Sequence, residues 1–293
     1  MSLPSTQQLI GKRHRRRGRM LVVGAVFGAA VLVGAMALAE ASSAAPSAQR
    51  GRWRGRGNTG PAPDVEYENQ PYDGQFTFAR VRFNPTSWSG GRYAWGLDLK
   101  WNHDYPRADR RLAEILGAVT GVEAQQNGSN IVTLDDPELF RYPWAYLCEV
   151  GFMDLSEDEA TNLRDYMLKG GFVVVDDFVG YHWYTFEEQM AKAMPEYRFL
   201  EIFEDHPVFH AFFEIEDLTF GGGQYRGYQG GGMPRYFGLF EDNDPTKRLM
   251  MIANFDNDIG EYWEFASSQY ILIDLSNDAF KLGVNYVMYS MLH

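Results

Sequence analysis

A central segment of the chain, residues 142–178, combines two short apolar runs with an amphipathic stretch between them. Residues 144–148 are uniformly apolar, and residues 172–175 form a second apolar run rich in β-branched side chains. Unbroken apolar runs of this length are typical of strands that are buried on both faces of a parallel sheet. The stretch between them has the length and spacing of a helix. The segment therefore predicts a strand, a helix and a second strand in one βαβ unit.

The predicted helix of this unit carries its own start and stop signals. Ser156 precedes Glu159 by three residues, which is the capping-box pattern. Gly170 and Gly171 follow the last apolar positions at helical spacing, and glycine adopts the left-handed conformation that ends a helix without a Cβ clash. Parallel strands joined by a helix form right-handed crossovers, so the two strands are expected side by side.

The carboxyl ends of these two strands are the first candidate site. Ligands of open α/β sheets bind beyond the carboxyl ends of the parallel strands. The turn that begins at Glu149 follows the first strand, and Asp176 and Asp177 close the second. We therefore expect these three carboxylates to lie together at one edge of the sheet.

The rest of residues 71–293 predicts strands and helices around this unit. Strands are expected at 76–83, 130–134, 198–203, 212–215 and 249–255, and helices at 104–119, 185–194 and 279–292. Asp104 is expected to cap the first of these helices, and a turn or short helical segment is expected to start at Asp135 and Asp136. The pattern predicts an α/β domain, built as a three-layer sandwich with a mostly parallel sheet.

Two stretches depart from this pattern. Residues 88–101 are dense in aromatic side chains (Trp88, Tyr93, Trp95 and Trp101), which we interpret as packing residues, although exposed aromatics would suit stacking on a sugar. Residues 221–232 contain seven glycines in twelve positions. No Lys-Ser/Thr pair or helix start follows, so this is not a phosphate loop. Either a mobile lid or a plain flexible loop fits it.

The first 41 residues have the pattern of an export signal. Residues 1–20 carry no acidic side chain and six lysines and arginines: Lys12, Arg13, Arg15, Arg16, Arg17 and Arg19. An uncharged apolar run at 21–39 and small residues around 37–41 follow, as in the apolar and cleavage regions of such signals. The apolar run is also about long enough to span a bilayer. The alternative is therefore that residues 21–39 anchor the protein to the inner membrane.

Charge and composition limit the classes of partner. Residues 42–70 are dominated by small residues, proline and arginine and are expected to be a disordered linker. The formal net charge of the chain is −12, and removal of the six cationic residues of the signal leaves −18. Nucleic-acid-binding proteins need a basic surface, so no nucleic acid partner is expected. Contact with a membrane is expected only through the N-terminal segment, and the remainder is expected in the periplasm or outside the cell.

Cys148 is the only cysteine, which excludes an intramolecular disulfide. Its position at a strand–turn–helix junction resembles that of the nucleophile in several hydrolases. A nucleophile elbow requires small residues two positions before and two after the nucleophile, and here Tyr146 and Val150 stand there. We therefore interpret Cys148 as structural.

Further candidate site residues follow the later strands. The expected ligand-binding set is Glu149, Asp176, Asp177, His206, Asn254, Asp256 and Asp258. Asp177 and His206 are the candidates for acid–base catalysis. Asp256 and Asp258 are the candidates for holding a divalent cation, although no glutamate stands where the twelfth ligand of a calcium loop belongs. Alternatively, Asp256 and Asp258 cap a following turn or helix, and no cofactor is required.

Four segments resemble one known family. They read YPWAYL…VGFMDLSEDEATNLRDYMLKGGFVVVDDF, EDHPVFHAFFEI, NFDNDIGEYWE and DAFKLGVNYVMYSML, of which GGFVVVDD and KLGVNYVMY are the most specific. Over about residues 76–293 the chain resembles DUF4159, a domain of unknown function in bacterial envelope proteins. The resemblance implies a flavodoxin-like fold of the class I glutamine amidotransferase type. It does not imply that chemistry, because the Gly-x-Cys-x-Gly elbow and the later His-x-Glu are missing. ThuA-like proteins, which are linked to sugar use, share this fold and imply a carbohydrate ligand.

These features favour an exported bacterial envelope protein that binds a ligand or partner at its acidic sheet edge, without amidotransferase activity. An envelope protein or a carbohydrate is the expected partner. The alternative is a hydrolase acting on a glycan or peptide, with or without a metal, and a third hypothesis is an anchored scaffold subunit. The hydrolase hypothesis predicts that Asp177, His206 and Asp256 lie within reach of one another.

Overall fold

The computed structural model describes residues 68–86, 92–93, 96–221, 227, 229–268 and 271–293. The expected signal or anchor at 1–41 and nearly all of the expected linker lie outside these ranges, as do Trp88, Trp95 and part of the glycine-rich stretch. None of the helices in the described ranges combines the length and the apolarity that a membrane crossing needs.

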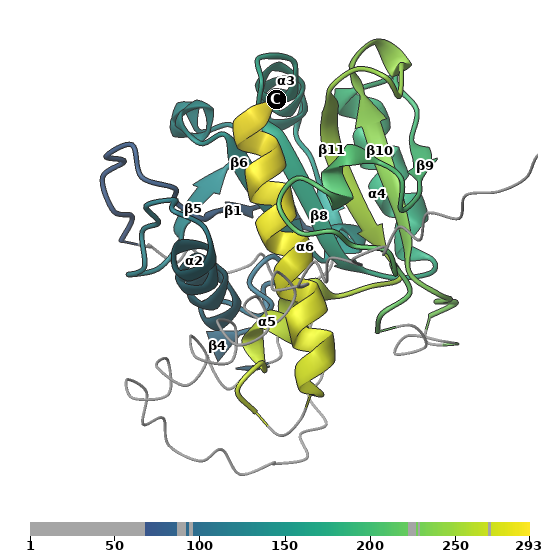
Figure 1. The fold of residues 1–293 in the computed structure, drawn as a ribbon. Helices are drawn as coiled ribbons and strands as arrows, with labels where there is room; N and C mark the ends of the chain where they lie inside the picture. The colour runs from purple at the N-terminus through teal and green to yellow at the C-terminus, as the bar shows by residue number, and fades with distance from the viewer. Residues whose placement is uncertain (1–67, 87–91, 94–95, 222–226, 228, 269–270) are drawn as a thin grey trace, which may run out of the picture.

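Among the described residues, seven strands form the central sheet (Figure 1). They are β1 (Ala79–Arg82), β5 (Asn130–Thr133), β6 (Trp144–Cys148), β8 (Phe172–Phe178), β9 (Leu200–Ile202), β10 (Arg235–Phe240) and β11 (Leu249–Phe255). Their order is β5-β1-β6-β8-β11-β10-β9; β10 is antiparallel to both of its neighbours and the other pairs are parallel. In chain order, the parallel strands follow the 2-1-3-4-5 order of flavodoxin-like sheets.

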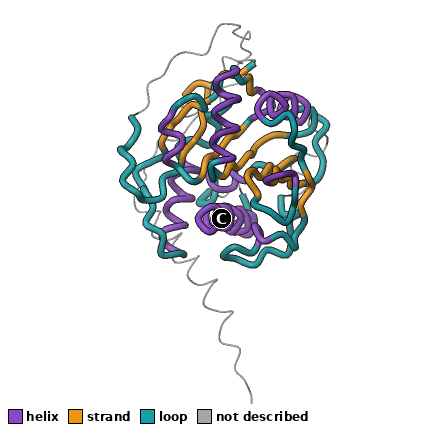
Figure 2. Tube along the Cα trace, turned by 90° about the horizontal axis from the view of Figure 1, so that it is seen from above, coloured by secondary structure: helices purple, strands orange, loops and turns teal. Residues whose placement is uncertain are grey.

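Helices cover both faces of the sheet and create three layers (Figures 1 and 2). One face carries α2 (Arg107–Val119), α5 (Ile259–Glu264) and α6 (Ile273–Leu292), and the other carries α3 (Glu157–Leu168) and α4 (His182–Ala193). Alternate residues of β8 enter the two cores, with Val174 on the α6 side and Val173 on the α3 side. The predicted three-layer α/β sandwich with a mostly parallel sheet is confirmed.

The predicted βαβ unit is present, with β6 and β8 as parallel neighbours on either side of α3 in the chain. The Glu159 backbone N–H donates to Ser156 Oγ at 3.2 Å, and the Ser156 N–H donates to Glu159 Oε2 at 2.9 Å, so the capping box is complete. Gly170 has a φ of 115°, as a glycine stop requires. Gly171 is needed for packing, because a Cβ there would lie 2.4 Å from the Tyr166 ring.

Two predicted details are wrong. Asp104 does not cap α2, because the helix begins at Arg107 and the residue at its N-cap position is Pro106, which makes no side-chain cap. Residues 212–215 do not form a strand. The backbone N–H groups of Phe212 and Phe213 donate to Asn285 Oδ1 at 3.1 and 2.7 Å. These donors are therefore bonded to a side chain of α6 and not to a neighbouring strand.

Other boundaries shift, and some short elements were not predicted. The helices expected at 185–194 and 279–292 begin earlier, and β10 was not expected. The alternative of a helix capped by Asp258 is confirmed, because the Glu261 N–H of α5 donates to Asp258 Oδ1 at 2.8 Å. The short helix after Asp136 is η2 (Pro137–Arg141), and the Glu138 N–H donates to Asp136 Oδ1 at 2.8 Å. The remaining short elements are β2 (Asn84–Pro85), β3 (Arg92–Tyr93), β4 (Gly96–Leu97), η3 (Val150–Phe152), β7 (Met153–Asp154), η4 (Pro207–Phe209) and η5 (Glu241–Asn243).

Candidate functional site

The carboxyl ends of β6 and β8 bring Glu149 beside the aspartate pair, as the sequence predicts. The register pairs Cys148 with Asp176, and the Glu149 N–H donates to the Asp176 carbonyl at 3.2 Å. Glu149 and Asp177 both have left-handed backbones, with φ of 50° and 53°. Such φ values are uncommon for residues other than glycine and mark places where the surrounding fold holds the chain. In Figure 1 this edge lies at the lower end of the sheet, near α5.

His103 lies across this edge, which the sequence did not predict. Its Nδ1 is 3.0 Å from Asp177 Oδ2 and 3.3 Å from Glu149 Oε1, and its Nε2 is 3.4 Å from Asp98 Oδ1. Burial by itself would lower the pKa of His103. The hydrogen bonds to Asp177 and Asp98 and the nearby charge of Glu149 outweigh it and raise the pKa to about 10.

A buried arginine holds the loop that carries His103. Arg80 is 1% exposed on β1, and its Nη1 donates to the carbonyl oxygens of Trp101 at 3.1 Å and His103 at 3.0 Å. Its Nε donates to Asp109 Oδ2 at 3.0 Å, and Nη2 donates to Asp109 Oδ1. The guanidinium therefore joins β1, α2 and the loop before α2. Trp101 is 2% exposed, in line with its interpretation as a packing residue.

Asp177 also belongs to a second cluster, which is made of three carboxylates. One side-chain oxygen from each of Asp104, Asp177 and Asp258 lies within 4.8 Å of the others. Asp104 Oδ2 is buried and has no hydrogen-bond partner within the described part of the chain. Asp258 begins α5 and accepts a hydrogen bond from the Glu261 N–H at 2.8 Å. Burial, and next the charge of Asp177, raises the pKa values of Asp104 and Asp258 well above the ordinary range.

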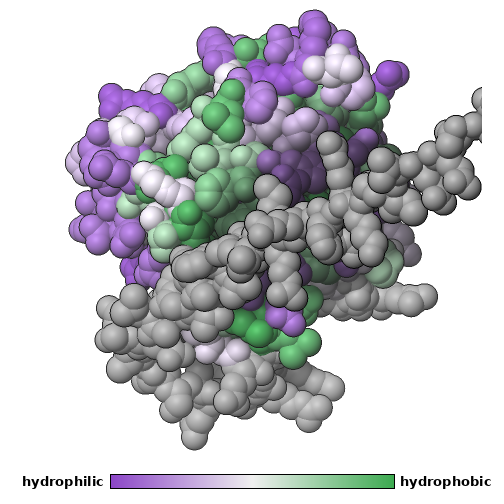
Figure 3. Space-filling model, in the orientation of Figure 1, coloured by the Kyte–Doolittle hydropathy of each residue, from purple (hydrophilic) through white to green (hydrophobic). Residues whose placement is uncertain are grey.

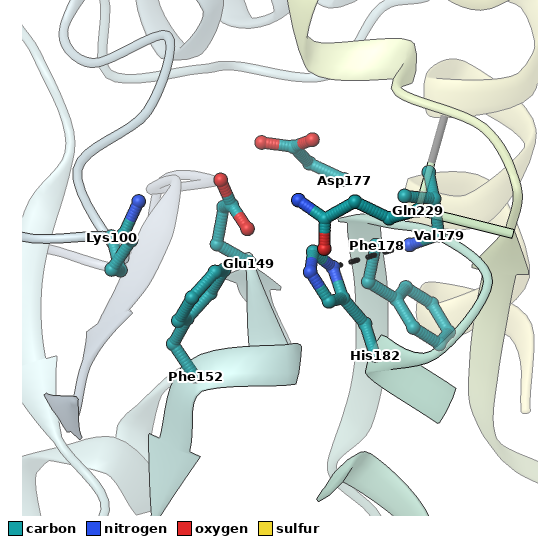
Figure 4. Close-up of a pocket in the computed structure, with 8 residues that line it drawn as sticks. All are labelled: Lys100, Glu149, Phe152, Asp177, Phe178, Val179, His182 and Gln229. Carbon is teal, nitrogen blue, oxygen red and sulfur yellow. Dashed lines mark hydrogen bonds between the residues drawn. The ribbon is translucent and has the colours of Figure 1, made fainter. Parts of the chain in front are cut away.

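A cavity of about 100 Å³ opens beside Glu149 (Figure 4). Its lining residues are Lys100, Glu149, Phe152, Asp177, Phe178, Val179, His182 and Gln229. Glu149 Oε2 is buried without a hydrogen-bond partner among the described residues. Burial, and next the charge of Asp177, raises the pKa of Glu149 to about 8. Burial lowers the pKa of His182, so a neutral imidazole lines the opposite wall.

Two predicted ligand-binding residues, Asp176 and Asn254, form hydrogen bonds inside the core of the fold. Asp176 is fully buried and accepts hydrogen bonds from Tyr146 Oη at 2.8 Å, the Gly260 N–H at 2.9 Å and Asn254 Nδ2 at 3.2 Å. Asn254 Oδ1 in turn accepts from Tyr286 Oη at 2.9 Å. This network connects β6, β8 and β11 to α5 and α6, and gives Asp176 and Asn254 a structural role.

Asp256, predicted as a cation ligand, bonds to backbone groups. The Gly180 N–H donates to its Oδ1 at 2.8 Å, and the Gly232 N–H donates to its Oδ2 at 2.9 Å. Both carboxylate oxygens therefore join the end of the glycine-rich stretch to the turn between β8 and α4. Of the two predicted cation ligands, Asp258 belongs to a group of three carboxylates with Asp177, whereas both carboxylate oxygens of Asp256 are bonded to backbone N–H groups.

His206 lies at the other end of the sheet from Asp177. Its Nδ1 accepts from the Val208 N–H at 3.2 Å, and its ring is near Phe240 and Tyr289. Tyr289 Oη accepts from the backbone N–H of Leu249, the first residue of β11, which places this contact at the amino end of that strand. The structure therefore does not bring His206 to Asp177, and the three-residue constellation of the hydrolase hypothesis does not form.

Cys148 is enclosed by the arginine-centred contacts. Arg80 Nη1 is 3.2 Å from its Sγ, and the thiol donates to the Trp101 carbonyl at 3.1 Å. Burial raises the pKa of this thiol well above its usual range, which opposes formation of a thiolate nucleophile. This environment supports the structural interpretation of Cys148.

Sequence reasoning missed the residues that complete the site. These are Asp98, Lys100, His103 and Asp104 before α2, and His182 and Gln229 on the cavity wall. The available signal was the run DLKWNHD at 98–104, in which charged residues alternate with buried Leu99 and Trp101 immediately before a helix. The aromatic residues of this run predicted packing, and its charged residues were not among the predicted site residues.

Comparison with known families matches residues 77–291 to the family described as "Domain of unknown function (DUF4159)". The matched range lies inside the predicted domain at 71–293 and includes every site residue described above. A search of curated proteins finds no match. Because the family match covers well over half of the chain, this protein belongs to the DUF4159 family.

Proposed function

We propose that this chain is an exported bacterial envelope protein whose DUF4159 domain binds a carbohydrate in the cavity between Glu149, Asp177 and His182. One observation carries the proposal. Polar side chains from four separate segments converge on one small cavity at the carboxyl ends of β6 and β8 (Figure 4). Cavities with a few convergent polar groups at this edge are the usual ligand sites of α/β sheets.

The chemistry of the cavity and its surroundings suits a sugar. Two carboxylates, a carboxamide and an imidazole offer hydrogen-bond partners for hydroxyl groups, and Phe152 and Phe178 supply apolar wall. At the start of α4, next to His182, Tyr181 and Tyr184 are 67% and 69% exposed. Aromatic rings in such positions can stack on the apolar face of a sugar ring. The small cavity would take one end of the ligand.

Isothermal titration of the full chain with neutral hexoses, amino sugars and uronic acids tests this proposal. We expect one class to bind, Asp177→Asn to weaken its binding at least tenfold and Tyr184→Ala to weaken it a few-fold. Phe140→Ala is the matched control, because Phe140 is an exposed aromatic that does not line the cavity. Failure of all three classes, or binding that Asp177→Asn leaves unchanged, would contradict the proposal and favour a protein partner.

A hydrolase acting on a glycan or peptide is the second candidate. The observation that favours it is a carboxyl group with a pKa of about 8, Glu149, next to the carboxylate of Asp177. Enzymes that hydrolyse glycans commonly use two neighbouring carboxyl groups, one as acid and the other as base or nucleophile. Labelled oligosaccharides and peptides would show turnover, and Glu149→Gln would remove turnover while ligand binding remains. Binding without turnover of any substrate would contradict the hydrolase candidate and support a binding function only.

Export is proposed from residues 1–41, with the anchor at 21–39 as its alternative. N-terminal sequencing of the mature protein, together with alkaline extraction of membranes, separates the two. A soluble mature chain that begins near residue 40 supports cleavage. A full-length chain that stays with the membrane supports the anchor.

A further inference from the structure

Three side chains beside the cavity, two of which (Glu149 and Asp177) line it, have the spacing of ligands to one ion. His103 Nδ1 lies 3.0 Å from Asp177 Oδ2 and 3.3 Å from Glu149 Oε1, and all three groups lie within 4.8 Å of one another. Ligands bound at 2.0–2.2 Å to one cation, at tetrahedral or octahedral angles, are about 2.8–3.6 Å apart. The spacing suits both a small cation and a hydrogen-bonded imidazolium, so two further observations decide between them.

The first observation is an unused carboxylate oxygen. Glu149 is only 9% exposed, and its Oε2 is buried without a hydrogen-bond partner within the described part of the chain. A buried carboxyl oxygen without a hydrogen-bond partner is unfavourable. The left-handed backbone of Glu149 aims this carboxylate at Asp177 and the cavity (Figure 4). A bound cation would satisfy this oxygen, whereas protonation of His103 does not.

The second observation is the carboxylate that contacts the other ring nitrogen of His103. His103 presents Nδ1 to the two carboxylates, and its other nitrogen, Nε2, is 3.4 Å from Asp98 Oδ1. Asp98 is in turn paired with Lys100 Nζ at 3.2 Å. Metal-binding histidines usually donate their second ring N–H to a carboxylate or carbonyl, which fixes the tautomer and the ring orientation. The order Asp98, His103, cation would repeat this arrangement.

We propose that His103, Glu149 and Asp177 together bind one divalent transition-metal cation, of the Zn²⁺ or Mn²⁺ class, beside the cavity that Glu149 and Asp177 line. One imidazole and two carboxylates favour these ions over Ca²⁺ and Mg²⁺, which prefer oxygen ligands only. Because Glu149 and Asp177 line the cavity, water or hydroxyl groups of a ligand in the cavity would complete the coordination. In this respect the inference rests on the proposed carbohydrate-binding function, although cation binding is testable without a sugar.

The cation is assigned to the cavity side of Asp177 and not to the side of Asp104 and Asp258. On that second side, Asp258 already accepts from the Glu261 N–H, and the Gly260 backbone is so close that a Cβ would lie 2.6 Å from Asp104 Oδ2. A cation there would have little space for water ligands. The cavity lies on the Glu149 side and includes Asp177 in its wall.

Titration of the metal-free full chain with ZnCl₂, MnCl₂ and CaCl₂ tests the inference by calorimetry and thermal unfolding. We expect Zn²⁺ or Mn²⁺ to bind one to one and to raise the melting temperature, with Ca²⁺ at least tenfold weaker. Glu149→Gln and His103→Gln should each weaken binding about a hundredfold. Asp98→Asn should weaken it about 10- to 100-fold through the orientation of His103. Circular dichroism of each variant checks that it is folded, and Co²⁺ absorption reports the coordination.

Two control variants distinguish this site from two other sites at which a cation could bind. His210→Gln removes a half-buried histidine paired with the exposed Glu214, where Zn²⁺ could bind adventitiously. Asp104→Asn removes a ligand from the other side of Asp177. Loss of binding in either control with no loss in Glu149→Gln overturns the assignment, and so does the absence of any binding. Sugar binding without any cation binding would reject the cation and leave the carbohydrate proposal intact, whereas cation binding without any sugar binding would do the reverse.

Discussion

Glu149 and Asp177 end neighbouring strands with the same left-handed backbone, which neither residue type favours by itself. Such conformations cost of order 1–3 kcal/mol each and persist where the surrounding fold imposes them. Here the result is two carboxylates that face each other and a third charged group, His103. Because burial disfavours charge, the protonation of these side chains is coupled to the stability of the fold.

Glu149→Gln should stabilise the chelator-treated protein at high pH. The folded-state pKa of Glu149 is raised to about 8 from its ordinary value, so the neutral acid is favoured in the fold. The stability that protonated Glu149 contributes to the fold is fully present below about pH 4.5 and is lost as the pH rises through 8. A glutamine does not titrate, so its advantage should grow between pH 6 and pH 9 and reach about 1–2 kcal/mol. Urea unfolding at both pH values measures it, with exposed Glu157→Gln as the control. A variant that is less stable than the wild type at pH 9 would contradict the prediction.

His206→Asn should remove a different pH dependence. Burial lowers the folded-state pKa of His206 to about 4, so the stability it contributes is present above about pH 6.5 and is lost as the pH falls toward 4. Partial solvent access limits the effect to about 1–2 kcal/mol. Asparagine can still accept the Val208 N–H at the start of η4. Thermal unfolding between pH 4 and 7 should show a shallower slope for the variant. His210→Gln should keep the wild-type slope, because the folded-state pKa of the half-buried His210 is raised and its coupling to stability falls above this range. Equal slopes for His206→Asn and the wild type would reject this assignment.

At the scale of elements, the two faces of the sheet differ in how their helices approach it. On the α6 face, α6 lies in front of the sheet and contacts α2 and α5, which also contact each other (Figure 1). Their close approach depends on Gly283 of α6, where a Cβ would lie 2.6 Å from Trp263 and 2.7 Å from Leu112. The same packing sets the position of α5, and with it Asp258. Helix packing and site geometry are therefore connected on this face.

Gly283→Ala should destabilise the protein. Alanine favours a helix over glycine by about 1 kcal/mol, but overpacking of a closed core costs about 1–3 kcal/mol or more. We expect a net loss of about 1–2 kcal/mol in urea unfolding. Gly121→Ala is the matched control, because a Cβ there meets nothing within 4 Å. A Gly283→Ala variant as stable as Gly121→Ala would show that α6 can shift at no cost.

At the scale of the whole molecule, the site depends on contacts between distant parts of the chain. Asp177 and His103 are 74 residues apart. Arg80 on β1 donates to the His103 carbonyl oxygen and also forms an ion pair with Asp109 of α2. The molecule is acidic, with a formal net charge of −12, and hydrophilic residues dominate the upper part of the face in Figure 3. An acidic chain with further buried carboxylates at one edge is a favourable environment for a cation.

Arg80→Met should cost about 3–5 kcal/mol, because it leaves the Asp109 carboxylate buried and unpaired. The double variant Arg80→Met, Asp109→Leu should recover most of that loss in urea unfolding. It should not recover Zn²⁺ affinity, because the carbonyl oxygens of Trp101 and His103 still lack their donor. Arg235→Met breaks the exposed pair with Glu201 and should cost at most about 1 kcal/mol. A double variant with wild-type Zn²⁺ affinity would show that Arg80 does not position His103.

The sequence by itself determined the βαβ unit, the capping box, the three-layer class and the placement of Glu149 beside Asp177. Each of these follows from short-range signals, namely apolar runs, caps and the rule that parallel strands share an edge for their carboxyl ends. Only the tertiary structure decided which other side chains complete the site. Asp104 appeared to be a helix cap and Asp256 a cation ligand. The first faces the site, and the second bonds to the backbone of Gly180 and Gly232. Whether an acidic residue meets a backbone N–H or another charge depends on long-range packing, which the spacing of residues along the chain does not record.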